Sequence, residues 1–96
     1  MPPVKKLSET EIQQGLLSLP GWTLQNGKLH KTFKFQSFVE AFGFMAKVAL
    51  LSEAMNHHPE WSNVYDRVTI NLETHDAGGI TALDLDLAGK IEILLA

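Results

Sequence analysis

The apolar run from Phe38 to Met55, which ends at His57-His58-Pro59, constrains the fold of this 96-residue chain more than any other feature. Ser37 and Glu40 have the spacing of a capping box at its start. The run therefore predicts a central helix that continues to about Asn56 or the first of the two histidines. Because proline cannot continue a helix and moves the preceding residue toward an extended conformation, both imidazoles are expected at a junction between helix and strand.

The central helix is too apolar to cover only one small sheet. One strip is predicted to face a sheet and consists of Phe38, Phe42, Met45, Ala49 and Met55. A second strip remains, consisting of Val39, Phe44, Val48, Leu50 and Leu51. A large exposed apolar patch usually marks a partner surface, so we favour self-association. In the alternative, the first and last helices cover the second strip within one chain.

The rest of the chain supplies strands and two further helices around the central one. Ser8 and Glu11 have capping-box spacing, and Asn26-Gly27 is a strong two-residue hairpin signal. In the second strand Lys31 falls on the apolar side, where its stem can snorkel at a sheet margin. The expected elements are helices over 9–17, 38–56 and from 81 onward, with strands over 22–24, 29–35, 61–65 and 68–74. The last helix is expected to bury Leu83, Leu87, Ile91 and Leu94.

The element order α-β-β-α-β-β-α predicts an α+β fold, with a four-stranded antiparallel sheet and helices packed on one face. Residues 1–96 are expected to form a single domain, in which residues 1–6 are a flexible arm. A formal charge of −3 argues against general nucleic-acid binding, and the absence of cysteine excludes disulfides and thiolate metal sites. Because no segment has the pattern of a signal peptide or a membrane span, we expect a soluble cytoplasmic protein.

The histidines are the residues best suited to chemistry. His57 and His58 lie at the predicted helix end and His75 follows the last predicted strand, so the topology can bring three imidazoles together. Histidine exchanges protons near neutral pH, which suits elimination of water, where one group protonates a leaving hydroxyl and another removes a proton. Glu53, one helical turn before His57, is expected to orient or charge-stabilise that ring. Alternatively, the adjacent histidines are solvated cappers that interact favourably with the helix dipole.

Other interpretations concern metal binding and three further side chains. Neighbours in a helix point about 100° apart, and the sequence has no His-x-x-x-His or Glu-x-x-His spacing, so we predict no metal site. Asp84 completes a capping arrangement with Thr81, and it gains a functional role only if that helix start borders the histidines. Trp61 either packs in the core or flanks a flat ring. His30 is expected to be exposed on the polar face of its strand.

A longer spaced pattern joins these residues. It consists of Glu53-x3-His57-His58-Pro59, Tyr65, His75 and Asp84, with Gly21-Trp22, Phe42-Gly43-Phe44-Met45, Val48-Ala49 and Pro59-Glu60-Trp61-x-Asn63-Val64-Tyr65. In these residues the chain resembles the pterin-4a-carbinolamine dehydratase family, whose animal members are also known as dimerisation cofactors of a homeodomain transcription factor. The resemblance covers the chain from about Ser8 to Glu92.

The resemblance implies a hydro-lyase that removes water from 4a-hydroxytetrahydrobiopterin, the product of aromatic amino-acid hydroxylases. The product is quinonoid dihydropterin, so the activity supports tetrahydrobiopterin recycling. No metal or organic cofactor is implied, because the pterin is the substrate. The resemblance assigns acid–base catalysis to His57, His58 and His75, and orientation or charge stabilisation of a histidine to Asp84. The implied substrate-binding residues are Glu53, Asn56, Trp61, Glu73, Thr74 and Asp76.

The resemblance also implies a homo-oligomer, as a homodimer or homotetramer, which agrees with the surplus apolar strip. A different class of function remains open, in which the same fold serves as a protein-binding or transcriptional coactivator module. One residue departs from the family: animal members have arginine before the motif aspartate, and this chain has Leu83. That change puts in doubt any contribution from a cation beside Asp84.

Overall fold

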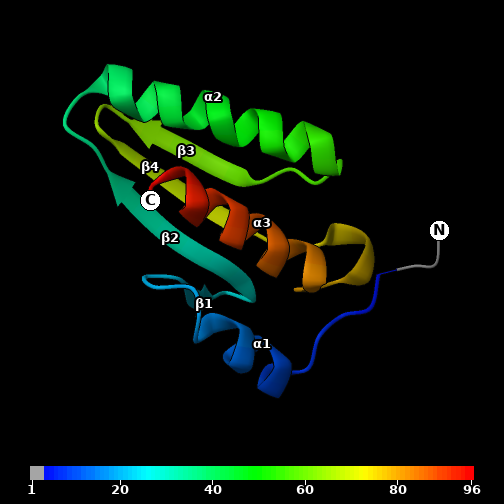
Figure 1. Cartoon of the computed structure of the whole chain (residues 1–96). Coiled ribbons are helices and arrows are strands. Elements are labelled where there is room, and N and C mark those ends of the chain that lie inside the picture. The colour runs from blue at the N-terminus through cyan, green and yellow to red at the C-terminus, as the bar shows by residue number, and fades with distance from the viewer. Residues whose placement is uncertain (1–3) are drawn as a thin grey trace.

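The computed structural model describes residues 4–96 and confirms the order α-β-β-α-β-β-α (Figure 1). The flexible arm predicted for residues 1–6 lies half outside the described residues and stays a prediction. The elements are α1 (Glu9–Leu16), β1 (Thr23–Gln25), β2 (Lys28–Lys34), α2 (Phe38–Met55), β3 (Glu60–Val64), β4 (Arg67–Leu72), the 3-10 turn η1 (His75–Ala77) and α3 (Ala82–Leu94).

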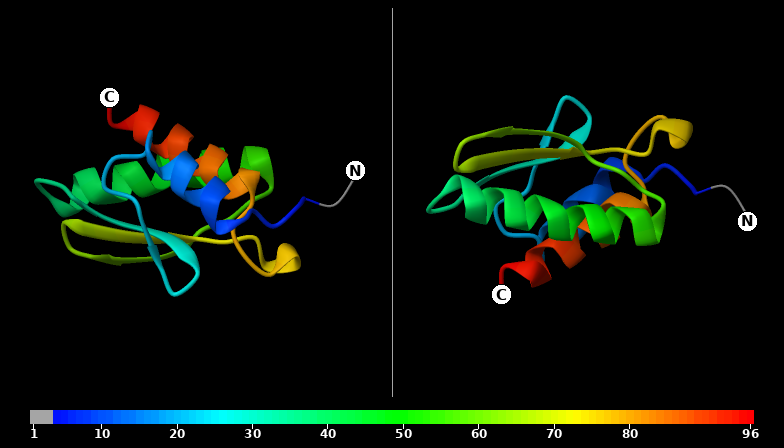
Figure 2. Two further views of the ribbon diagram at one scale, coloured as in Figure 1. Left: turned by 90° about the horizontal axis from the view of Figure 1, so that it is seen from below. Right: turned by 90° about the horizontal axis from the view of Figure 1, so that it is seen from above.

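The strands form one antiparallel sheet in the order β1-β2-β4-β3. The predicted hairpin turn is confirmed, since Asn26 and Gly27 separate the paired residues Gln25 and Lys28 and both have positive φ, at 53° and 76°. Figure 2 shows the sheet nearly edge-on, with all three helices on one side of it. The helices therefore cover one face as predicted, and the other face is left open.

The core lies between the covered face of the sheet and the helices. The sheet contributes Leu29, Phe33, Val68, Ile70 and Leu72, and the helices contribute Ala41, Phe44, Val48, Leu87, Ala88 and Ile91. The rings of Phe33 and Phe35 each lie 4.9 Å from the ring of Phe44, so the aromatic side chains of β2 and α2 pack directly against each other. This packing fixes α2 along the sheet.

The predicted division of α2 into two strips is wrong. The buried side chains are Ala41, Phe44, Val48 and Ser52, spaced three or four residues apart, whereas Phe38 and Phe42 are exposed. Both predicted strips are apolar, so their pattern alone does not select the buried face, and α2 packs against α3 as well as against the sheet. An exposed apolar surface remains, now consisting of Phe38, Val39, Phe42 and Leu50.

The last helix buries a polar side chain that the predicted apolar stripe did not include. Leu87 and Ile91 are buried as predicted, and Leu83 and Leu94 are half-buried. Asp84 is fully buried instead. No helix of residues 4–96 is long and apolar enough to cross a membrane.

Lys31 lies on the helix-covered side of β2, as its place in the strand predicted. Its Nζ donates to Glu92 Oε2 of α3 at 2.8 Å and to the carbonyl oxygen of Pro20 at 2.8 Å. The same Glu92 oxygen accepts a hydrogen bond from Trp22 Nε1 at 2.9 Å. The lysine is therefore paired at the sheet margin, where it links β2 to α3.

Candidate active site

The end of α2 separates the two adjacent histidines. Asn56 adopts the left-handed conformation, with φ 50° and ψ 44°. Its N–H donates to the carbonyl oxygen of Glu53 at 3.1 Å, and the N–H of His57 donates to that of Ser52 at 3.0 Å, as in a Schellman motif. The helix thus ends at the predicted place, and the reversal after it turns His57 inward while His58 stays outside.

His57 forms a buried pair with Asp84. The side chain of His57 is 9% exposed and that of Asp84 is 0% exposed, and His57 Nε2 lies 2.5 Å from Asp84 Oδ1. The other carboxylate oxygen, Oδ2, accepts hydrogen bonds from Thr74 Oγ1 and from the Thr81 N–H, both at 2.9 Å. Both roles considered for Asp84 therefore occur together, because it completes the capping box of α3 and contacts a histidine.

The partner predicted for Glu53 is wrong. Glu53 Oε1 lies 2.5 Å from Nε2 of His58, and not beside His57, because the left-handed residue at Asn56 breaks the helical spacing on which the prediction relied. This second pair is open to solvent, with side chains 54% and 78% exposed. Ion pairs in such surroundings contribute only about 0–1 kcal/mol to stability.

In both pairs the Nδ1 atom of the imidazole is available for proton transfer. Each imidazole directs Nε2 to a carboxylate, and within residues 4–96 neither Nδ1 has a hydrogen-bond partner. A carboxylate accepts hydrogen bonds only, so it favours the tautomer with hydrogen on Nε2 and a lone pair on Nδ1. Each ring can thus accept a proton at Nδ1, and the resulting imidazolium faces a negative charge.

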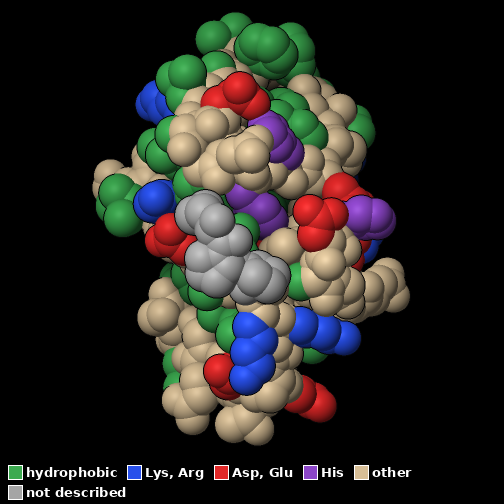
Figure 3. Space-filling view, turned by 90° about the vertical axis from the view of Figure 1, so that its right-hand side faces the viewer, with side chains coloured by type: hydrophobic (Ala, Val, Ile, Leu, Met, Phe, Trp, Pro, Cys, Tyr) green, Lys and Arg blue, Asp and Glu red, His purple; other side chains and the backbone are tan. Residues whose placement is uncertain are grey.

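His75 lies in η1, the turn between β4 and α3, and its side chain is exposed. It makes no hydrogen bond or ion pair with His57 or His58 among the described residues. All three nevertheless belong to the end of the molecule where α2 finishes and α3 begins (Figure 1). Figure 3 looks at this end and shows histidine side chains close to acidic ones.

A charged cluster next to His75 was missed by the sequence analysis. Lys28 Nζ lies 2.7 Å from Glu60 Oε2 and 3.7 Å from Glu73 Oε1. Its hydrogen bond, and more weakly the charge of His75, lower the pKa of Glu60 below its ordinary value. The hydrogen bond to Glu60 raises the pKa of Lys28. The sequence analysis named Glu60 and Glu73 in the family resemblance but not their link to Lys28, which becomes apparent only once the strand order is known.

The remaining candidate residues lie in different surroundings. Trp61 is half-buried and packs against the core, whereas Asn56 and Asp76 are exposed and Glu73 is half-buried. Thr74 is bonded to Asp84, which links it to the buried pair. His30 is half-buried on the open face of the sheet, where its Nδ1 lies 2.8 Å from Asn71 Oδ1.

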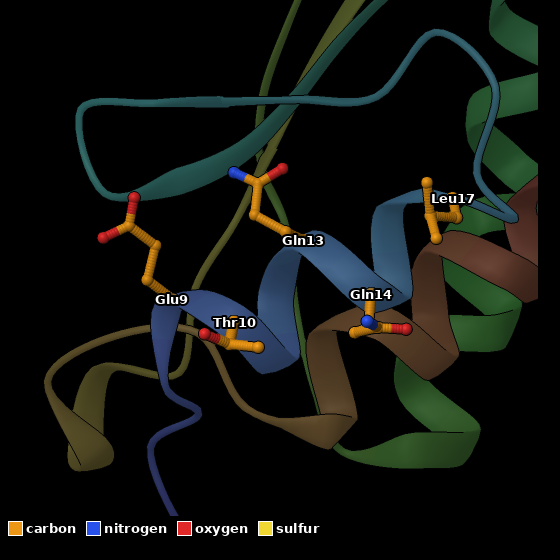
Figure 4. Close-up of a pocket in the computed structure, with 5 residues that line it drawn as sticks. All are labelled: Glu9, Thr10, Gln13, Gln14 and Leu17. Atoms are coloured by element: carbon orange, nitrogen blue, oxygen red, sulfur yellow. The ribbon is translucent and has the colours of Figure 1, made fainter.

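Three surface hollows lie away from His57, His58 and His75. One, of about 420 Å³, is lined by Glu9, Thr10, Gln13, Gln14 and Leu17, and Figure 4 shows that all five side chains come from α1 and the turn after it. A second, of about 170 Å³, lies over Thr32 and Thr69 on the open face of the sheet, and a third, of about 250 Å³, lies between α2 and the end of α3. Among the described residues, no group of three His, Cys, Asp or Glu side chains is arranged to hold a metal ion.

Comparison with known proteins shows similarity over almost the whole chain. Residues 5–94 match the family described as pterin 4 alpha carbinolamine dehydratase. A protein of Solibacter usitatus with the provisional name pterin-4-alpha-carbinolamine dehydratase is 62% identical over 91 residues, which cover 95% of this chain and 96% of that protein. A Rhizobium johnstonii protein with the same provisional name is 52% identical, over 93% of this chain and 90% of its own length.

Two solved structures are also similar. A transcriptional coactivator/pterin dehydratase from Brucella melitensis superposes with a TM-score of 0.92 at 41% identity, over 96% of this chain and all of that one. A pterin dehydratase-like protein identified as a RuBisCO assembly factor in the alpha-carboxysome superposes with a TM-score of 0.66 at 26% identity, over 77% of this chain and 88% of that one. The fold is therefore found in proteins described by a dehydratase activity and in one described by an assembly role.

Proposed function

Because this chain belongs to the pterin-4α-carbinolamine dehydratase family, we propose that it catalyses dehydration of a 4a-hydroxytetrahydropterin. The substrate is 4a-hydroxytetrahydrobiopterin or a close relative, and the product is the quinonoid dihydropterin. Such a reaction returns the pterin formed by aromatic amino-acid hydroxylases to a form that a reductase can recycle. The proposal includes no metal and no organic cofactor, and it places the reaction in the cytoplasm.

The reaction needs one proton delivered and one removed. The 4a-hydroxyl oxygen takes up a proton, the C4a–O bond breaks, and water leaves. The proton on N5 then departs, and its electron pair completes the C4a=N5 double bond. Acid–base groups in contact with the two sites supply both transfers, which contribute typically about 10²–10⁴-fold in rate.

The observation that carries the proposal is the buried pair of His57 and Asp84. A fully buried carboxylate that accepts Nε2–H holds the ring in one tautomer and stabilises the imidazolium that forms when Nδ1 takes a proton. A histidine that only caps a helix in solvent needs no such partner. The pair therefore favours the catalytic interpretation over the capping one.

His58 and His75 supply the remaining proton transfers in this proposal. Both are exposed, so their protons exchange readily with water between turnovers. Glu53 of α2 orients His58 through the exposed pair that their side chains form. Asn56, Trp61, Glu73 and Asp76 surround the same end of the molecule and are proposed to hold the pterin.

The test is the decay of a 4a-hydroxytetrahydropterin in the presence of purified protein. We expect His57→Ala to lower the rate by about 10²-fold or more, and His75→Ala to lower it as well. His30→Ala is the matched control, because its imidazole is bonded to Asn71 on the open face of the sheet. Unchanged rates in both site variants would overturn the catalytic assignment.

A second candidate function is protein association. Phe38, Val39, Phe42 and Leu50 form an exposed apolar surface on α2, and such surfaces usually bind a partner. We propose that this surface joins copies of the chain into a homodimer or homotetramer. Analytical ultracentrifugation of Phe42→Glu should show a smaller assembly than the wild type, and an unchanged mass would refute the proposed interface. If the wild type also lacks dehydration activity, the coactivator-type alternative gains support.

A further inference from the structure

We propose that Thr74 is a positioning residue, which acts on His57 through Asp84 and does not contact the pterin. This inference rests on the proposed function. Thr74 lies two residues after the end of β4, immediately before the histidine of η1, and ten residues before the aspartate to which it is bonded. Thr74 is therefore placed to connect the buried pair, which contains His57, with the turn that carries His75.

The hydrogen bonds around Thr74 can run in only one direction. Its hydroxyl lies 2.9 Å from Asp84 Oδ2 and 2.7 Å from Thr81 Oγ1. Because a carboxylate only accepts, the single hydroxyl hydrogen of Thr74 is used for Asp84. The hydroxyl of Thr81 must then donate to Thr74, while itself accepting from the N–H of Leu83 at 3.2 Å. Donors thus follow one another from the start of α3 to the buried carboxylate.

This chain of donors fixes the carboxylate that faces His57. Two donors hold Oδ2, namely the Thr74 hydroxyl and the Thr81 N–H, which leaves Oδ1 for the imidazole. Successive hydrogen bonds in a low-dielectric interior polarise and strengthen one another. Removal of the Thr74 hydroxyl would therefore loosen both the orientation of Asp84 and the tautomer preference of His57.

The backbone of Thr74 positions the turn that carries the third histidine. Its N–H donates to the carbonyl oxygen of Gly79 at 2.9 Å, and its own carbonyl oxygen accepts from Ala77 at 3.1 Å and from Gly79 at 3.4 Å. Side chain and backbone are both occupied by these internal bonds, so Thr74 has no hydrogen left to donate to a ligand. A positioning role thus replaces the substrate-binding role that the family resemblance implied for Thr74.

The experiment compares Thr74→Val, which removes the hydroxyl at nearly constant shape, with Thr74→Ser, which keeps it. We expect the valine variant to lower kcat about tenfold, the scale for losing a hydrogen bond to a charged group, with KM changed less than about twofold. The serine variant should stay within about threefold of the wild type. Thr69→Val is the matched control, because Thr69 Oγ1 is bonded to Thr32 Oγ1 at 3.2 Å on the open face of the sheet.

A second readout needs no substrate. Long-range ¹H–¹⁵N spectra report which nitrogen of His57 carries hydrogen, and we expect Nε2–H in the wild type and in Thr74→Ser. In Thr74→Val the Nδ1–H form should become populated. If the valine variant does not fold, Thr74→Ala removes the same hydroxyl with less bulk and carries the same expectations.

The outcomes separate this inference from the proposed function. An unchanged His57 tautomer together with an unchanged kcat in the hydroxyl-free variant would overturn the positioning role, even if the wild type is an active dehydratase. A raised KM with an unchanged kcat would overturn it too, in favour of direct ligand contact. An inactive wild type whose His57 tautomer still responds to Thr74→Val would refute the dehydratase activity and leave the positioning role supported.

Discussion

Replacement of Asp84 by asparagine tests the buried pair most sharply, because it keeps the shape of the side chain and changes its charge and its hydrogen bonding. Asp84 accepts three hydrogen bonds, from His57 Nε2, Thr74 Oγ1 and the Thr81 N–H. An amide has one oxygen to accept and one NH₂ group to donate. Only one side of the introduced amide can therefore reproduce the bonds made by the carboxylate.

Two orientations of the amide are possible, and the surroundings favour one. If the amide oxygen faces Thr74 and Thr81, both of their hydrogen bonds survive, and NH₂ faces His57. Nε2 must then accept, so the hydrogen moves to Nδ1 and the ring can no longer take a proton there. The opposite orientation would place NH₂ against two donors and leave them unsatisfied in a buried site.

The expected magnitudes follow from this choice. In the favoured orientation all three contacts are kept but the charged acceptor becomes neutral, which should lower the free energy of unfolding by about 1 kcal/mol, measured by urea denaturation. Inversion of the tautomer removes acid–base catalysis and should lower the rate of carbinolamine decay by about 10²-fold or more. Asp86→Asn is the matched control, since this residue lies on the same helix and its exposed carboxylate pairs with Lys90 at 3.5 Å.

The reasoning would be refuted by either of two results. A decay rate for Asp84→Asn within about threefold of the wild type would show that the carboxylate is not needed for proton transfer, since the effect expected for lost acid–base catalysis is far larger. Hydrogen on His57 Nε2 in this variant would show that the amide takes the other orientation.

Three further predictions concern residues around the site. Lys28→Gln should raise the pKa of Glu60 toward its ordinary value in an NMR titration, because the hydrogen bond from Lys28 is the main cause of its lowering. A lowered pKa of Glu60 stabilises the folded protein at pH values above the ordinary pKa, and this contribution is lost as the pH falls through the pKa of the folded state. The difference in free energy of unfolding between the wild type and Lys28→Gln should therefore shrink on acidification. A constant difference would contradict the assignment. Ser52→Ala should raise the free energy of unfolding by up to about 1 kcal/mol, because it removes a buried hydroxyl that has no hydrogen-bond partner among residues 4–96. A loss of stability would contradict this expectation. Glu53→Gln should cost less than about 1 kcal/mol in urea unfolding, as befits an exposed pair, and a larger loss would mean that the carboxylate is more deeply engaged.

Much of the fold follows from local sequence signals. Capping residues at Ser8, Ser37 and Thr81 mark all three helix starts, and Asn26-Gly27 marks the first hairpin. These signals act within a few residues, so the sequence alone suffices to place them. The family pattern, in turn, points to His57 and Asp84 as site residues, and the structure brings these two into contact.

Other features depend on packing between distant segments. The buried face of α2 is set by its packing against the sheet and α3, and the sequence does not reveal it because both predicted strips are apolar. The partner of Glu53 depends on the positive φ of Asn56, which the sequence permits but does not require. The link from Thr74 to Asp84 joins residues ten positions apart across a turn, so no helical or strand period could indicate it.

The rate of 4a-hydroxytetrahydropterin decay, measured against protein concentration, tests the central claim most directly. The account predicts that this rate rises in proportion to the wild-type protein, and that the slope for His57→Ala is lower by about 10²-fold or more. A wild-type rate equal to that of buffer alone, or equal slopes for the two proteins, would contradict it.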